Sequence, residues 1–122
     1  MSETTRKASA DEFAEQIASI EGVDQFALVR NDGRIVTHNL INPDAFTKMI
    51  TTCGVNSSSL RKPLGVSHLK QIVLNRPNNR NIIIFPLYKY FLGIQQDGGT
   101  DQETVILTVS DLLHQIAKKH AH

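Results

Sequence analysis

The feature that most constrains the fold of this chain is an Asp-Gly pair between two apolar runs. Asp32 and Gly33 follow the run 23–30, which alternates imperfectly, and a β-branched run resumes at 34–40. An Asp-Gly pair favours a tight hairpin turn because the turn needs positive φ angles. The sequence therefore predicts an antiparallel hairpin whose strands cover 23–30 and 34–40.

Three more strands are expected in the second half of the chain. The segment 66–75 has strand-like composition, 81–85 is an apolar run, and 90–96 ends at a turn over 97–99. An apolar run without alternation is typical of a central strand that is buried on both faces. Residues 77–79 are of types that favour a turn, and they separate the first two of these strands.

Two helices are indicated in the first half of the chain. The first is expected over 10–20, where apolar residues recur at helical spacing after a capping box that starts at Ser9. The second is expected over 43–61, with Asn42 as its cap and Pro43 as its first helical residue.

The last segment supports two interpretations. Residues 104–109 have the composition of a strand, yet Thr100 and Glu103 form a second capping box and the apolar spacing that follows is helical. Basic residues near the end suit a helix C-terminus. We predict one helix over 101–119.

The expected order of elements is α-β-β-α-β-β-β-α. Hairpin-like connections and short loops favour an α+β layered fold, in which helices pack on the faces of a five-stranded antiparallel sheet. At 122 residues, we expect a single domain over 9–122, preceded by a disordered tail over 1–8.

Composition narrows the classes of partner. The formal net charge is +1, which argues against nucleic acid or an anionic membrane as the main partner because both require concentrated positive charge. The longest apolar stretch, 82–87, is too short to span a bilayer, and no signal peptide is visible. The single Cys53 fits a reducing compartment. We expect a cytoplasmic protein.

No pattern in the sequence indicates catalysis. No histidine has a partner at a standard metal-ligand spacing, and Cys53 lies on an apolar helix stripe that favours a packed, inert thiol. The pair Gly98-Gly99 is followed by no lysine and is surrounded by acidic residues, so it is unsuited to phosphate. We therefore expect no enzyme activity, no metal and no cofactor.

The helix expected over 43–61 has a wider apolar side than one contact with a sheet needs. Core packing accounts for Phe46 and Ile50, but Met49, Cys53 and Leu60 extend the stripe. Small residues gather in its second half, at Gly54, Ser57, Ser58 and Ser59. Weakly polar surface of this kind usually marks a contact with another protein or a second copy.

Several local motifs occur in an order that resembles the Roadblock/dynein light chain family. They are the segment 20–23 before the first strand, the segment 27–33 into the hairpin, and the helix rich in small residues. The chain departs from the usual pattern at Gln25 and Phe26, where many members carry a glycine or a small residue. The resemblance covers nearly the whole chain after residue 9.

The resemblance implies both an arrangement and a function. It places the helix 43–61 on one face of the sheet and the helices 10–20 and 101–119 on the other, in a Roadblock/profilin-like fold. It also implies a homodimer formed through the second helix and the neighbouring edge strand. Family members regulate or scaffold small Ras-like GTPases, and in bacteria one such dimer activates a GTPase of motility and cell polarity.

The expected partner or dimer interface follows from the helix surface and the resemblance together. It comprises Phe46, Met49, Ile50, Cys53, Gly54, Ser57, Leu60, Val66, His68 and Lys70. In such a dimer Cys53 could face its symmetry mate. Arg76 and Arg80 flank a turn and are weaker candidates for a GTPase contact, with ordinary solvated charge as the favoured alternative.

A second interpretation is a ligand-sensing module of the profilin-like or PAS-like kind. It requires a small molecule bound between sheet and helix in a pocket with a few convergent polar groups. The polar candidates are His68 and Tyr88 or Tyr90.

Overall fold

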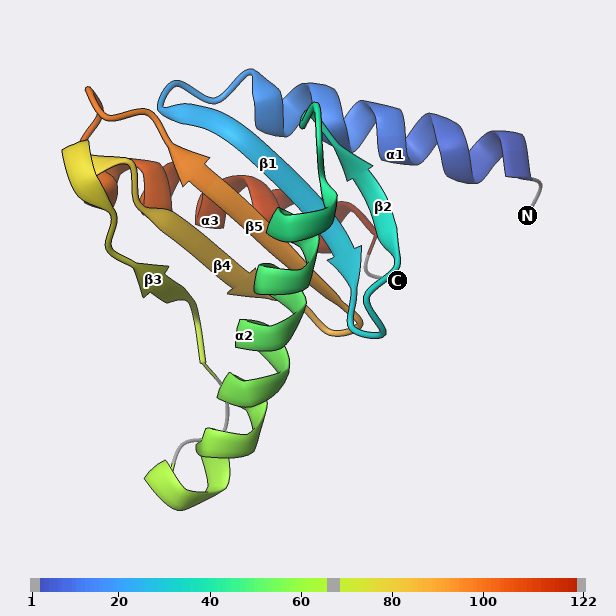
Figure 1. The fold of residues 1–122 in the computed structure, drawn as a ribbon. Coiled ribbons are helices and arrows are strands. Elements are labelled where there is room, and N and C mark those ends of the chain that lie inside the picture. Colours follow the sequence, from blue (N-terminus) through green and yellow to red (C-terminus); the bar gives the residue numbers. More distant parts are fainter. Residues whose placement is uncertain (1–2, 66–68, 121–122) are drawn as a thin grey trace.

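Five strands form one antiparallel sheet in the order β2-β1-β5-β4-β3, with one helix on one face and two on the other (Figure 1). The computed structural model describes residues 3–65 and 69–120. Its elements are α1 (Glu3–Ala18), β1 (Val23–Arg30), β2 (Ile35–His38), α2 (Asp44–Leu64), β3 (Ile72–Leu74), a 3-10 turn (Pro77–Asn79), β4 (Ile82–Pro86), β5 (Tyr90–Gln96) and α3 (Gln102–His120). The predicted fold class is confirmed.

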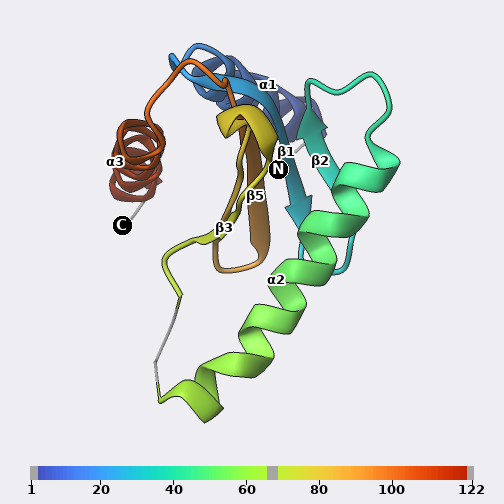
Figure 2. The ribbon, with the colours of Figure 1, turned by 60° about the vertical axis from the view of Figure 1, so that its left-hand side comes forward.

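The sheet has a hydrophobic core on each face, because successive side chains of a strand point to opposite sides. Between the sheet and α1 and α3 lie Ile17, Phe26, Leu28, Ile83, Phe85, Leu92, Ile94, Val105 and Val109. Between the sheet and α2 lie Ala27, Val29, Ile50, Ile82, Ile84 and Phe91. Figure 2 shows the resulting layers, with α2 across the sheet from α3. The central strands are thus buried on both faces, as the apolar run 81–85 predicted.

The β1–β2 hairpin forms at the predicted turn. Gly33 has a φ of +96°, and its amide donates to the carbonyl of Arg30 at 2.9 Å. The second strand is shorter than the predicted 34–40. The Asn39 amide still donates to the carbonyl of Phe26 at 3.3 Å, but a side chain takes the place of the carbonyl in the return hydrogen bond. The Asn39 Oδ1 accepts the amide of Phe26 at 2.8 Å, and its Nδ2 donates to the carbonyl of Asp24 at 3.2 Å.

The first helix is longer at its N-terminus than predicted. It begins at Glu3 and ends at Ala18, so the start predicted at Ser9 is wrong and residues 3–8 are helical instead of belonging to a disordered tail. The segment 3–8 contains no glycine or proline, and its charged residues and alanine are good helix formers. The capping pattern at Ser9 was therefore not needed to start the helix.

The ambiguous last segment is a helix throughout 104–109, as predicted. Its cap is Asp101, whose Oδ2 accepts the amide and the hydroxyl of Thr104, both at 3.1 Å. The capping box predicted at Thr100 is therefore wrong by one residue. A carboxylate at this position also suits the positive end of the helix.

The region after α2 differs most from the sequence-based expectation. The helix continues through Pro63 to Leu64 and ends at Gly65, which has a φ of 73° and donates its amide to carbonyls of the last turn. No side chain caps its N-terminus, so the cap expected at Asn42 is not formed. The strand predicted over 66–75 is reduced to Ile72–Leu74, and residues 66–68 lie outside the described residues.

Helix α2 lies close to the sheet because a glycine on each surface receives a large side chain from the other. A Cβ placed on Gly54 of α2 would lie 2.6 Å from the Phe91 ring. A Cβ placed on Gly93 of β5 would lie 2.2 Å from Cδ1 of Ile50. Both distances are shorter than carbon atoms tolerate, so glycine at these two positions sets the distance between helix and sheet.

A buried network of amide side chains holds the other end of the sheet. Gln96 is fully buried; its Oε1 accepts from Nδ2 of Asn81 at 3.1 Å, and its Nε2 donates to the carbonyl of Thr100 at 2.8 Å. The Asn81 Oδ1 accepts the amide of Arg76 at 2.8 Å. The network joins the start of β4 to the loops before β4 and before α3.

The substitution Gly54→Ala should lower the free energy of unfolding by about 1–3 kcal/mol, because the new methyl group overlaps the Phe91 ring. This is expected although alanine favours a helix over glycine by about 1 kcal/mol. Urea denaturation followed by circular dichroism measures the change. The exposed Ser59→Ala serves as a control, and the cost of Gly54→Ala should shrink in a Phe91→Leu background. A Gly54→Ala variant more stable than the parent would contradict this packing.

The substitution Gln96→Leu should destabilise the chain by about 1–3 kcal/mol, because it leaves buried polar groups without their partner. The neighbouring Gln95→Leu, at a partly exposed position, should change the stability by less than about 0.5 kcal/mol. A double-mutant cycle with Asn81→Ala measures the coupling. Additive effects of the two changes would show that the amides act independently.

Candidate protein-interaction site

Helix α2 extends beyond the end of the sheet, as both ribbon views show (Figures 1 and 2). All residues over 58–64, which we call the overhang, are exposed. Leu60 and Leu64 are 53% and 63% exposed. Most helical stability in proteins comes from packing of an apolar face, and two exposed leucines on unsupported helical turns are typical of a surface that a partner covers.

One side of α2 is directed toward β3. Met49 lines a shallow recess of about 370 Å³ together with Ile82 of β4 and Arg76, which follows β3. Ile72 and Leu74 of β3 pack against the same core cluster as Met49. Helical spacing puts Cys53 and Leu60 on the same side. Met49 and Cys53 pack, partly buried, against the core below α2. We call this the β3 side of α2.

The outer edge of β3 lies beside this surface. Among the described residues β3 pairs only with β4, through Ile72, Val73 and Leu74. An edge strand presents unpaired amides and carbonyls to any strand that approaches it. The β3 side of α2 and the edge of β3 thus offer apolar contacts and main-chain hydrogen bonds in one place.

The residues predicted for the interface differ in how far they are exposed to solvent. Ile50, Gly54 and Ser57 are buried within the chain, although Ser57 also lines a recess described below; their part in an interface stays a prediction. Phe46, Met49 and Cys53 are partly buried, whereas Leu60 and Lys70 are exposed. Val66 and His68 lie outside the described residues.

The two arginines around the turn Pro77–Asn79 have different environments. The Arg80 guanidinium forms an ion pair with the carboxylate of Asp24, which engages it within the chain. Arg76 instead lines the shallow recess beside Phe46 and Met49. The structure therefore brings Arg76, and not Arg80, next to the surface of α2.

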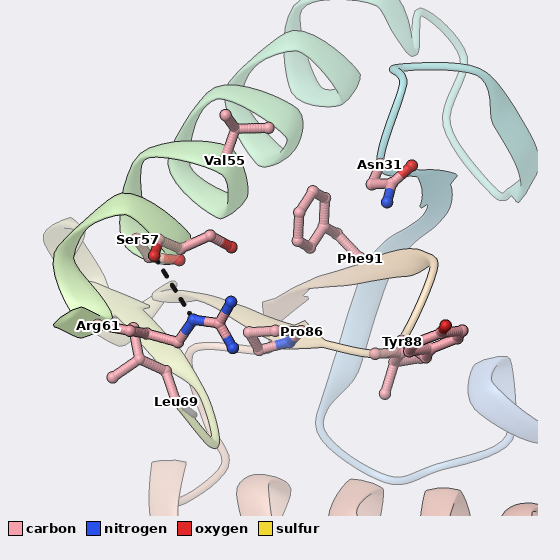
Figure 3. Close-up of a pocket in the computed structure, with 10 residues that line it drawn as sticks. Asn31, Val55, Ser57, Arg61, Leu69, Pro86, Tyr88 and Phe91 are labelled. Carbon is pink, nitrogen blue, oxygen red and sulfur yellow. Dashed lines mark hydrogen bonds between the residues drawn. The ribbon is translucent and has the colours of Figure 1, made fainter. Parts of the chain in front are cut away.

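A larger recess of about 550 Å³ lies under the overhang at the end of the sheet (Figure 3). It is lined by Asn31, Val55, Ser57, Ser58, Arg61, Leu69, Pro86, Leu87, Tyr88 and Phe91. Arg61 reaches from the helix toward Pro86, and its Nε donates to the carbonyl of Ser58 at 3.5 Å. No sequence pattern indicated this recess, because its walls come from α2, two turns and the segment before β3.

The structure places the two tyrosines of the ligand-sensing interpretation apart, and His68 lies outside the described residues. Tyr90 packs on the face of the sheet that α1 and α3 cover, whereas Tyr88 lines the recess under the overhang. The close contact of Ile50 with Gly93 leaves no space for a molecule between α2 and the sheet at that point.

Residues 3–65 and 69–120 contain no cluster of metal ligands, since no three His, Cys, Asp or Glu side chains there are grouped around a common point. None of the helices in the same ranges has the length and hydropathy needed to cross a bilayer.

Comparison with solved structures identifies the fold. "MglB with tetrameric arrangement" is similar with a TM-score of 0.75 and 16% identity, covering 93% of this chain and 88% of that one. A Roadblock/LC7 domain from Streptomyces avermitilis has a TM-score of 0.75 and 11% identity, and the match covers 89% of this chain and 95% of that domain. Myxococcus xanthus MglB has a TM-score of 0.71 and 14% identity, and the match covers 100% of this chain and 95% of MglB.

The chain has a Roadblock-type fold. No protein-family model matches the sequence, and no curated protein matches it either. The similarity thus lies in the arrangement of elements, since the identities are all below 20%. Gln25 and Phe26, where the sequence departs from the family, are accommodated: Phe26 is buried in the core under α1 and α3.

Proposed function

We propose that this chain is a homodimeric, non-enzymatic regulator or scaffold of a small Ras-like GTPase. The β3 side of α2, the overhang and the edge of β3 form its interaction surface. The observation that carries the proposal is the overhang, where Leu60 and Leu64 are more than half exposed on helical turns without a strand beneath them.

A second copy fits this surface by its chemistry. The side of α2 that bears Met49, Cys53 and Leu60 is apolar, and the adjacent edge of β3 consists of Ile72, Val73 and Leu74. A two-fold arrangement buries the same patch on both copies. A solved MglB with this fold has a tetrameric arrangement, which supports self-association here.

The GTPase partner is supported by the family resemblance. MglB structures from two bacteria, one of them described as a gliding protein of Thermus thermophilus, share the fold over most of the chain. Regulators of this kind act by binding, so the absence of a catalytic constellation in the sequence fits the proposed role.

Replacing Leu60 and Leu64 together by Asp should reduce self-association by at least about tenfold in dissociation constant, because the charges would be buried at the contact. Light scattering over a concentration series measures the change. The matched control is Leu107→Asp on α3, which removes a leucine that is 62% exposed on the other layer. A parent protein that remains monomeric at micromolar concentration would contradict the dimer.

Immobilised protein should retain a small GTPase from an extract of its source cells in a manner that depends on the nucleotide. Extracts loaded with GTP and with GDP are compared, and the retained protein is identified by mass spectrometry. Equal recovery of the GTPase from both extracts would argue for a scaffold, and recovery of no GTPase from either would overturn the assignment of the partner.

A further inference from the structure

The charges of the chain are separated in space, although they nearly cancel in sum. Residues 45–96 contain no Asp or Glu at all. They contain the basic residues Lys48, Arg61, Lys62, Lys70, Arg76, Arg80 and Lys89. All 12 acidic residues of the chain lie outside this segment, in α1, α3, the first residue of α2, the start of the sheet and the turns. The α2 layer is therefore basic, and most of the acids lie in the layer of α1 and α3 and in the turns.

The recess under the overhang is a place where this positive charge meets an apolar cavity. Arg61 forms part of its wall, and Lys62 follows on the exposed end of the helix. Tyr88 also lines the recess, and Nζ of Lys89 lies 5.8 Å from the centre of its ring. An anion entering the recess thus meets the guanidinium of Arg61, and Lys89 lies beside another of the lining residues.

The acid next to the recess in the chain, Asp32, is already engaged by two arginines. Its Oδ2 lies 2.9 Å from Nη2 of Arg34 and 3.8 Å from Nε of Arg30. The hydrogen bond from Arg34 holds the pKa of Asp32 below its usual range, so the carboxylate stays charged and paired. This group of three side chains contributes net positive charge to the neighbouring turn.

The lining suits an apolar side chain. Phe91, Pro86 and Leu69 supply apolar surface within the recess (Figure 3). Tyr88, at its edge, is 93% exposed. Tyrosine and arginine beside a pocket are the residue types that most often dominate the binding energy of protein interfaces. A tyrosine so fully exposed gains contact area only when a partner covers it.

The recess is separate from the β3 side of α2. A Cβ on Gly33 would lie 3.9 Å from Thr51, which shows that the Thr51 side of the helix is directed toward the β1–β2 turn. Val55 follows four residues later on the same side and lines the recess. Leu60 is on the opposite side of the helix. Val55 therefore borders the recess from the side of the helix that is turned away from Leu60, whereas Ser58 and Arg61 belong both to the overhang and to the wall of the recess.

We propose that the recess under the overhang docks an acidic segment of a partner protein, with one aromatic or aliphatic side chain inserted over Phe91 and carboxylates paired with Arg61 and the nearby lysines. The inference rests on the proposed function, because the segment belongs to the protein that this chain regulates. A recessed cavity favours a side chain over a membrane, since membrane docking uses protruding apolar residues. Nucleic acid is disfavoured because its binding requires a denser basic stripe.

The test is an NMR titration of the isotope-labelled chain with a short synthetic peptide, blocked at both ends, in which Asp and Glu flank a single Phe. Amide shifts are expected at Val55, Arg61, Leu69 and Phe91. The affinity should fall by about tenfold or more in Arg61→Glu. It should change by less than about twofold in Lys118→Glu, which makes the same charge change at an exposed site on α3.

Control probes separate the proposal from its alternatives. A peptide with Lys in place of the acids should not bind, one with Ala in place of Phe should bind more weakly, and Tyr88→Ala should weaken the acidic peptide. Equal binding of acidic and basic peptides, or equal effects of Arg61→Glu and Lys118→Glu, would overturn the proposal. Phosphatidylserine vesicles or single-stranded DNA that bind through Arg61, while the peptide does not, would also overturn it. None of these results changes the light-scattering test of self-association.

Discussion

The contact between α2 and the sheet determines most of what this chain presents to its surroundings. Ile50 fills the space over Gly93, and Phe91 fills the space over Gly54, so the helix lies low on the sheet and cannot admit a ligand beneath it. Buried groups hold the first part of α2 in place, and the last turns continue past the ends of the strands (Figure 1). The overhang is thus the exposed continuation of a packed helix.

A helix held in this way presents three different sides. The side of Ile50 and Gly54 builds the core, the side of Met49 and Leu60 is directed toward the edge of β3, and the side of Val55 borders the recess. The proposed regulator would use the second side for self-association and the third for another protein. The periodicity of 3.6 residues per turn places these sides on one element, since neighbouring residues point in different directions.

The sequence predicted those elements whose ends are marked by local chemistry. The strands 23–30 and 90–96 agree with the structure to the residue, because glycine-containing or proline-containing turns limit them on both sides. The strand predicted over 66–75 was too long: of its described residues, 69–75, only Ile72–Leu74 pair with β4, and composition alone does not show where a neighbouring strand ends. The surface of α2 was visible in the sequence as a stripe, whereas the recess was not, because Phe91 and Tyr88 join Arg61 only after the chain has folded.

The separation of charge changes what a net charge of +1 implies. Two copies that meet through the β3 side of α2 bring like charges such as Lys70 and Arg76 toward one another. Within the described residues, neither of these two side chains forms an ion pair that would offset this repulsion. Their association must therefore come from apolar contact and main-chain pairing, and salt strengthens it by screening the repulsion over about 10 Å. Binding of an acidic partner should instead weaken as the salt concentration rises, because salt screens the attraction between its carboxylates and the basic residues. In the proposed complex the carboxylates of the partner would also neutralise the basic layer, so binding of the acidic segment and the proposed self-association would favour one another.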